Sequence, residues 1–399
     1  MEKITFRDYT FEKPYIDKFT RKDTWVKFDI DNLYPERVLE IVNSSPLQKS
    51  ILESKKTYIL GAGLAPTAEN IYSPNMYETW DELIEKAVND LVYLNAMAFQ
   101  VCLNESGNRF SFYYQPVQQI RFANYNEHNI IEKAYLCTDW RKAQRNRNVV
   151  EIPMFGTETP KKGKTYLLYF APTQVGEYYY SIPEYMCAAN FIMADGALSQ
   201  YYNNFVHNNF SANLAIRFPV EPPEEKKQEL YDNLVKNFGG SQNAGNILVL
   251  FGESGVVPEI SPIETANADL YNSVMDTIKL ALVSANRLTS PILAGIVTST
   301  GFSSKSDEMI AAYTLYKLTV INQARAFVLK CFNKLLEMNG HGRVLKFIDF
   351  DIRKEFEGET QTNDKVEDKG NAVDQTDEQE KENNDVNEEE EKNDGNENE

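Results

Sequence analysis

Residues 289–304 read TSPILAGIVTSTGFSS, and residues 305–339 continue as KSDEMIAAYTLYKLTVINQARAFVLKCFNKLLEMN. The first stretch is small, polar and glycine-containing, which predicts a mobile loop. The second stretch has apolar side chains at helical spacing and the acidic pair Asp307-Glu308 near its start, so it predicts one long amphipathic helix. At 1.5 Å per residue this helix would span about 50 Å. Its apolar stripe is Met309, Tyr313, Tyr316, Val320, Ala324, Phe327, Cys331, Leu335 and Met338.

Two helices with a compact α/β segment between them precede the loop. In chain order the predicted elements are a helix at 181–208, a strand at 214–218, a charged helix at 222–238, a strand at 247–251 and a helix at 269–288. The apolar stripes of the two long helices are Phe191, Leu198, Tyr202 and Phe205 in the first, and Leu270, Val274, Ile278, Ala281 and Ala285 in the second.

The first 180 residues predict a mixed α and β region. Ser45 is a good capping residue and Pro46 suits the first turn of a helix, which Gly61 then ends. Predicted helices begin at Pro35, Pro46 and Trp80, and predicted strands lie at 99–103, 109–113, 117–122, 131–137 and 165–170. After the long helix, 344–350 offers little more than one apolar strand. The fold class is therefore α+β.

Composition argues against several protein classes. The chain of 399 residues is 42% hydrophobic, yet it has no apolar run long enough to span a membrane and no apolar signal core at its N-terminus. Four scattered cysteines without a CxxC pair are expected to be reduced thiols. The net charge of −18 is concentrated in 357–399, which holds 18 acidic and four basic side chains, against 41 and 37 in the rest. This tail should be disordered, and it either solubilises the chain or forms an acidic brush that keeps DNA from adhering.

The sequence offers no recognisable catalytic or metal-binding motif. It lacks the phosphate-binding pattern GxxxxGK[ST] and the pattern GxSxG, and Gly61-Ala62-Gly63 follows a helix rather than opening one. The three histidines, His128, His207 and His341, have no partner at metal-ligand spacing. We therefore predict no catalytic residue, no cofactor and no metal.

The densest positive charge lies in two short runs, Arg141–Arg147 and Lys161–Lys164. Each is typical of a solvated loop or turn, although the first could contact phosphates. A channel through which a polyanion slides needs weak contact, because each ion-paired phosphate adds affinity and drag. The nearly balanced charge outside the tail is therefore compatible with DNA transport.

The order and spacing of these segments resemble the portal proteins of tailed bacteriophages. Asn208-Asn209-Phe210 resembles the junction at which the first stem helix enters the clip, and Leu288–Gly295 resembles a segment that commonly reads vPxxLxG. Asn243-Ala244-Gly245 before an apolar strand resembles the clip. Thr138-Asp139-Trp140 and Ile182–Tyr185 are similar to portal-like proteins of gut-bacterial phages and prophages. The resemblance covers about residues 30–340, in a chain that is short for a portal and has a compact clip.

The resemblance implies a portal-like arrangement of regions. These are an N-terminal mixed α/β wing (1–180), a stem helix (181–209), a small α/β clip (210–263), a second stem helix (264–288), a tunnel loop (289–304), a long wing helix (305–339), a short crown-like end (340–356) and the acidic tail (357–399).

The resemblance also implies a function. The chain would form a homododecameric ring at one capsid vertex of the virion, assembled in the cytoplasm of the bacterial host without membrane association. Double-stranded DNA would pass through the ring during packaging and ejection. The ring would bind the large terminase, head-completion or adaptor proteins, and the major capsid protein. It would have no enzymatic activity, because ATP hydrolysis belongs to the terminase.

Two sets of candidate site residues follow from the resemblance. The DNA-channel candidates in the tunnel loop are Thr298, Ser299, Thr300, Ser303, Ser304 and Lys305. The terminase-docking candidates in the clip are Glu224, Glu225, Lys226, Lys227, Gln242 and Asn243. Lys305 is either a phosphate contact or a solvated lysine at a helix start, and Arg287 could form a salt bridge between subunits.

Two other functions remain open from the sequence. One is a soluble enzyme with an undetected site in the N-terminal α+β region, whose many aromatic residues could line a pocket. The other is a different phage assembly component, such as an adaptor or a scaffold.

Overall fold

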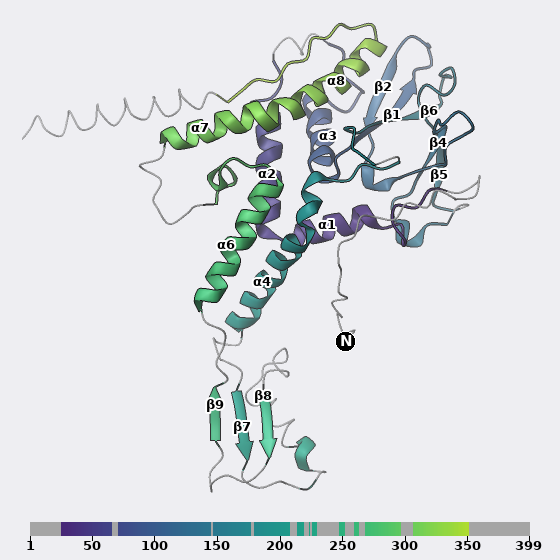
Figure 1. Ribbon diagram of the computed structural model, residues 1–399. Coiled ribbons are helices and arrows are strands. Elements are labelled where there is room, and N and C mark those ends of the chain that lie inside the picture. Colours follow the sequence, from purple (N-terminus) through teal and green to yellow (C-terminus); the bar gives the residue numbers. More distant parts are fainter. Residues whose placement is uncertain are drawn as a thin grey trace, which may run out of the picture. The chain divides into compact units, whose positions relative to one another are not determined.

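The structure is a computed structural model. It describes residues 25–65, 71–144, 147–176, 179–207, 214–218, 223, 226–229, 247–251, 259–262, 268–296 and 306–350. Contacts along the chain divide it into a unit at 1–349 and a second unit at 350–399. The helices and strands below all belong to the first unit (Figure 1).

Three helices open the described chain: α1 (Tyr34–Ser44), α2 (Pro46–Leu60) and α3 (Trp80–Leu94). The Ser45 hydroxyl caps α2 by accepting a hydrogen bond from the Gln48 amide at 3.1 Å. Thr79 and Glu82 form a capping box at the start of α3. Asn95 ends α3 in a left-handed conformation, with φ of 57°. Each helix begins within one residue of its predicted start.

Six strands follow: β1 (Met97–Leu103), β2 (Phe110–Tyr114), β3 (Ile120–Phe122), β4 (Lys133–Leu136), β5 (Val150–Pro153) and β6 (Thr165–Phe170). They form two antiparallel sheets, ordered β2-β1-β6 and β3-β4-β5. A single parallel bridge between Met154 and Leu167 joins the two sheets where β5 approaches β6. The predicted hairpin of β1 and β2 is confirmed.

Two details of this region differ from the sequence prediction. The predicted strand at 117–122 begins as a 3-10 turn, η2 (Val117–Gln119), and only its last three residues pair with β4. The turn arises because the Asp90 carboxylate on α3 accepts the Val117 amide at 2.8 Å and bends the chain there. β5 was not predicted: Val150, Glu151 and Ile152 alternate, but the run is only four residues long and ends in a proline, which a strand interior seldom contains.

The second half is mainly helical. Its elements are the 3-10 turns η4 (Glu184–Ala188) and η5 (Pro291–Ala294), the α-helices α4 (Ala189–His207), α6 (Ala268–Ala285), α7 (Ser306–Tyr316) and α8 (Asn322–Met338), and the π-helical segment η7 (Lys317–Ile321). The predicted long helix is therefore one continuous run of α7, η7 and α8, but it is not regular. A π turn inserts one extra residue, which a 3.6-residue period does not predict. Tyr313, Tyr316, Val320, Cys331 and Leu335 of the predicted stripe are buried.

The predicted stripes of α4 and α6 are only partly buried. Leu198 and Ile278 lie in the core, whereas Phe191, Tyr202 and Val274 are each about 40% exposed (39%, 40% and 42%). Both helices therefore carry apolar side chains that the described parts of the chain do not cover. The predicted strand at 344–350 is an extended segment with one isolated bridge, between Phe347 and Leu64.

A separate three-stranded sheet consists of β7 (Leu214–Phe218), β8 (Ile247–Phe251) and β9 (Glu259–Pro262). β7 is central, parallel to β8 and antiparallel to β9. Both predicted strands have their predicted bounds. A parallel pair needs a crossover connection, which agrees with the predicted helix between the strands, although only residues 226–229 of that helix are described.

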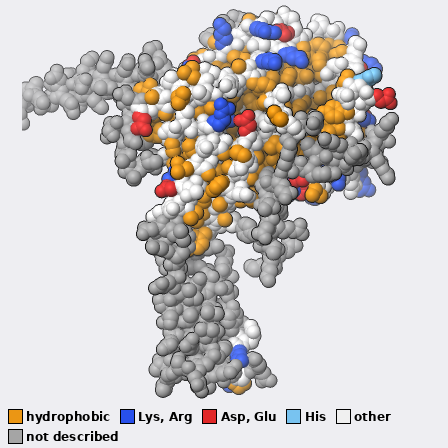
Figure 2. Space-filling model, viewed as in Figure 1, with side chains coloured by type: hydrophobic (Ala, Val, Ile, Leu, Met, Phe, Trp, Pro, Cys, Tyr) orange, Lys and Arg blue, Asp and Glu red, His pale blue; other side chains and the backbone are white. Residues whose placement is uncertain are grey.

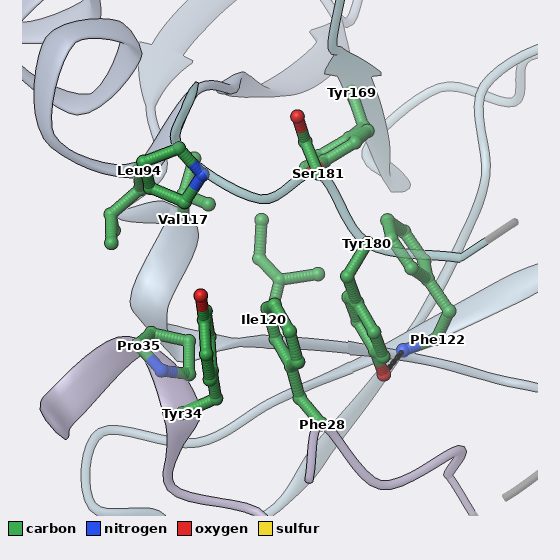
Figure 3. A pocket seen from close by; sticks show the side chains of 11 residues that line it. Phe28, Tyr34, Pro35, Leu94, Val117, Ile120, Phe122, Tyr169, Tyr180 and Ser181 are labelled. Carbon is green, nitrogen blue, oxygen red and sulfur yellow. Dashed lines mark hydrogen bonds between the residues drawn. The ribbon is translucent and has the colours of Figure 1, made fainter. Parts of the chain in front are cut away.

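An aromatic cluster joins the start of α1 to the sheets. The Phe28 ring stacks on Tyr34 and on Tyr180, with ring centroids 4.7 and 4.3 Å apart (Figure 3). The Tyr180 hydroxyl donates to the Val26 carbonyl at 2.5 Å and accepts the Phe122 amide at 3.0 Å. The space left among these side chains is about 10 Å³, room for one water at most, so the cluster is a packed core and not a ligand pocket.

Candidate functional site

The segment between α6 and α7 carries the predicted DNA contacts, and the structure describes how its first part is held. At the end of α6, Asn286 and Gln48 of α2 form a reciprocal amide pair, with N···O distances of 2.8 and 3.2 Å. Both side chains are buried. Arg287 then adopts a left-handed backbone with φ of 54°, a conformation that costs energy for a residue with a side chain. The amide pair and this turn together direct the chain out of α6.

The 3-10 turn η5 is fixed against α2. Ser50 donates to the Ala294 carbonyl and Tyr58 donates to the Leu293 carbonyl, each at 2.8 Å. Leu293 and Ala294 are buried. Gly295 follows with φ of 72°, which lets the chain turn away from α2 immediately after the anchored residues.

The other side of the segment is fixed to the α7–η7 run. The Thr289 hydroxyl donates to the Ala312 carbonyl at 2.7 Å, and the Arg287 guanidinium reaches the Thr319 carbonyl in the π turn at 3.4 Å. Tyr58 packs against both Tyr313 and Tyr316. Burial raises the pKa of Tyr58 and of Tyr316, so both phenols stay protonated near neutral pH. These rings, together with the bonds from Thr289 and Arg287 to backbone carbonyls, hold this side of the segment against the α7–η7 run.

The predicted site residues lie mostly outside the described parts of the chain. The structure does not describe the loop candidates Thr298, Ser299, Thr300, Ser303, Ser304 and Lys305. It also does not describe four of the clip candidates, Glu224, Glu225, Gln242 and Asn243. Lys226 is exposed and Lys227 is half-buried, one after the other on the helical turn 226–229. Sequence reasoning did not single out the anchors Gln48, Ser50 and Asn286. The sequence feature that could have revealed them is a polar residue at a position where the helical period predicts a side chain facing the core.

The two helices α4 and α6 lie side by side and are tied to α2 (Figure 1). Asp195 of α4 is buried, and its carboxylate accepts the Ser45 hydroxyl at 2.6 Å and the Leu47 amide at 3.1 Å. The carboxylate therefore sits at the N-terminus of α2, where the exposed amides and the helix dipole favour negative charge.

The outer surfaces of α4 and α6 are rich in apolar side chains, which Figure 2 shows as orange patches along these helices. On α4 they include Phe191 and Tyr202, and on α6 they include Val274 and Leu280, the last 63% exposed. Leu315 of α7 and Leu318 of η7 are exposed by 54% and 62%. Single exposed apolar residues are ordinary, but a series along neighbouring helices is typical of a protein interface.

The described residues offer little for catalysis. No group of three His, Cys, Asp or Glu side chains among them is placed to hold a metal. Arg121, the most deeply buried charge of the N-terminal region, bonds the Asn32 side chain and backbone, both at 2.7 Å, and pairs with Glu36 at 3.4 Å. These bonds give Arg121 a structural role. No helix in the described parts of the chain has the length and apolar character needed to cross a membrane.

Comparison with known proteins identifies the fold. No family model matches the sequence, and no curated protein matches it. A chain in the virion of a native gene transfer agent particle covers 85% of this chain and 91% of its own length, with a TM-score of 0.54 and 12% identity. This chain has the fold of that virion subunit. A chain in the neck of the native particle, computed with C12 symmetry, covers 85% and 90% with a TM-score of 0.50 and 13% identity.

A crystal structure of an HK97-family phage portal protein from Corynebacterium diphtheriae also matches. It covers 68% of this chain and 83% of its own, with a TM-score of 0.40 and 13% identity. The predicted α+β class is confirmed by the mixed helices and sheets. The fold shared with a subunit of a virion particle agrees with the predicted resemblance to a phage particle protein. The gut-bacterial type stays a prediction.

Proposed function

We propose that this chain is the portal subunit of a tailed phage or phage-like particle, forming a ring through which DNA is packaged and ejected. The observation that carries the proposal is the shared fold with a virion subunit over 85% of this chain. The predicted succession of stem helix, clip, stem helix, loop and long helix supports it, because α4, the β7–β9 sheet, α6, η5 and the α7–α8 run follow in that order.

The exposed apolar side chains support a ring of copies. The α4 surface is aromatic, with Phe191 and Tyr202, whereas the α6 surface is aliphatic, with Val274 and Leu280. Two different surfaces that meet make a head-to-tail contact, and head-to-tail contacts that close produce rings. The neck of the similar particle was computed with C12 symmetry, so we propose a dodecamer.

Within such a ring, the segment after Gly295 would line the channel and touch DNA. Its hydroxyl-bearing residues and Lys305 would make few, weak phosphate contacts, which suits sliding better than tight binding. The frame on α2 and α7 would fix the start of the segment. The sheet β7–β9, with Lys226 and Lys227 on the connection between its strands, would form the clip that meets the terminase.

The test is assembly followed by packaging. Twelve chains of 45.8 kDa would give a ring of about half a megadalton with a central hole in negative-stain images. Such rings, combined with terminase and capsid precursors, should support DNA packaging, and Lys305→Ala should change the packaging rate without changing ring mass. A chain that stays monomeric at working concentration and fails to complement a portal-deficient particle would exclude the proposal.

A second candidate is another ring of the neck, such as an adaptor. This candidate is favoured by the fold that the chain shares with a subunit in the neck of that particle, at a TM-score of 0.50. An adaptor would add to particles that already contain a portal. Particles made without this chain would then contain packaged DNA, whereas particles made without a portal would contain none.

A further inference from the structure

The loop at 71–79 carries the most exposed large apolar cluster of the described chain. Tyr72, Met76 and Tyr77 are exposed by 67%, 80% and 78%, within six residues of one another. Tyrosine and methionine are enriched at the centres of protein interfaces and depleted elsewhere on the surface. These exposed side chains lie in a loop that precedes the capped helix α3. Because exposing three large apolar side chains to water is unfavourable, a partner that covers them is expected.

The loop is held firmly from beneath. Asn75 is buried, and its side chain bonds the Phe112 carbonyl, the Glu78 carboxylate and the Tyr77 amide, each at 2.8 Å. The Phe112 amide of β2 donates to the Pro74 carbonyl at 2.9 Å.

Side chains on both flanks hold it as well. The Trp80 indole donates to the Tyr72 carbonyl at 2.9 Å. Arg109 donates to the Ser73 carbonyl at 2.5 Å, and its guanidinium stacks over the Tyr72 ring, 4.6 Å from the centroid. An apolar knob that is already ordered loses little entropy when it binds, which is the property of a good anchor.

A groove of about 550 Å³ lies between the two sheets, where β5 and β6 separate beyond their single bridge. Its floor is a line of neutral amides: Gln100 donates to Gln115 at 2.7 Å, and Gln115 donates to Gln119 at 3.2 Å. Val150, 62% exposed, stands at its wall with the buried Ile152. This volume is in the range that takes a few side chains of a partner.

The knob and the groove match in chemistry. A tyrosine ring needs apolar walls for its body and a polar group for its hydroxyl, and the groove supplies both, with Val150 at the wall and amides on the floor. The charged groups on its lining are paired: Glu151 with Lys133 at 3.1 Å, and Lys164 with Glu158. An uncharged apolar knob therefore fits better than a charged segment.

The knob does not fill the groove of its own chain, because it is exposed and borders the opposite edge strand, β2. We propose that the 71–79 knob of one copy occupies the groove between the two sheets of the next copy. The contact joins two different surfaces, so it is head-to-tail and would help to close the ring. The inference rests on the proposed function, because it takes the partner to be a second copy.

Cross-linking of the full chain tests the contact. Cys187 is exposed, Cys102 is half-buried and Cys137 lines the groove, so all three are first replaced by serine to remove competing thiols. Met76→Cys and Val150→Cys are then introduced together, and the assembled protein is oxidised with copper phenanthroline. A knob in the next copy's groove predicts a ladder of disulfide-linked oligomers on non-reducing gels. Either cysteine alone can link at most two chains, so the single variants serve as controls.

The outcomes separate the inference from the proposed function. Rings that form without a ladder would overturn the knob-and-groove contact and leave the portal proposal standing. Neither rings nor ladder would overturn both. A second measurement is the concentration of half-assembly, which Tyr77→Ala should raise by about tenfold or more, as expected for an interface anchor. Val175→Ala, an exposed apolar residue outside the knob, should leave it unchanged.

If Tyr77→Ala rings assemble normally but fail to enter particles, the knob binds another particle protein and the inference is wrong.

Discussion

Asp195 is the residue on which the attachment of α4 to α2 depends most. Replacing it with alanine removes the acceptor for the Ser45 hydroxyl and the Leu47 amide, which lie 2.6 and 3.1 Å from its carboxylate. Ser45 is fully buried and Asp195 is 5% exposed, so water cannot easily replace the lost acceptor. Each buried donor left unsatisfied costs about 1–3 kcal/mol. The loss of negative charge at the N-terminus of α2 adds about 0.5–1 kcal/mol.

Asp195→Ala should therefore lower the free energy of unfolding by about 3–5 kcal/mol. Asp195→Asn keeps one acceptor and the side-chain volume, so it should cost about half as much. The measurement is urea unfolding of the full chain followed by circular dichroism. Asp276→Ala is the control, because Asp276 is an exposed acid of α6 whose pair with Lys279 should contribute less than about 1 kcal/mol. A cost below about 1 kcal/mol for Asp195→Ala would refute the reasoning.

Three further predictions concern groups whose surroundings are equally defined. Burial raises the pKa of Asp90 from 3.8 to about 6, so the stability that its protonated form contributes is full below pH 3.8 and is lost as the pH rises through 6. Asp90→Asn should therefore remove up to about 3 kcal/mol of the pH dependence of the unfolding free energy over this window, measured by urea unfolding. An unchanged pH dependence in the variant would contradict the raised pKa of Asp90. Arg325 bonds the last carbonyls of α2, at Ile59 (2.8 Å) and Tyr58 (2.9 Å), and pairs with Asp349. Arg325→Ala should cost about 2–4 kcal/mol in thermal or urea unfolding, because the two carbonyls lose their donor. The exposed Arg343→Ala should cost little, and equal costs would count against a structural role of Arg325. The exposed Cys187 should react quickly with a maleimide. Burial raises the pKa of the Cys331 thiol to about 12, so Cys331 should stay unreactive until the protein unfolds. Labelling of Cys331 before unfolding, detected by peptide mass, would show that α8 opens in the folded protein.

Local chemistry made many elements predictable. The bounds of α3, β6, β7 and β8 follow from a capping box, turn residues and short runs of β-branched or aromatic side chains, all of which act within a few residues. The start of α2 follows from Ser45 and Pro46 for the same reason.

Long-range contacts account for what the sequence did not predict. The predicted stripe of α4 includes Phe191 and Tyr202, but burial is decided by which side of the helix meets the rest of the chain. The fully buried Ile192, about 100° around the helix from Phe191, shows that this side is rotated away from the centre of the stripe. Apolar residues left outside still follow the helical period, so periodicity alone cannot separate core from interface. The residues that anchor the candidate segment were not predicted for a related reason. The Gln48–Asn286 pair joins residues far apart in the chain, and a local sequence pattern does not show such a pairing.

The π turn at Lys317–Ile321 gives the α7–α8 run a discontinuity in phase. Each residue of an α-helix advances it by about 100°, and a π turn absorbs about one extra residue. If the same residues formed a regular α-helix instead, α7 would be rotated by about that angle relative to α8. Arg325 would remain in register with the end of α2, but Ala312 would turn away from Thr289. The length of this one turn, rather than any side chain in it, therefore sets which face α7 turns toward Thr289.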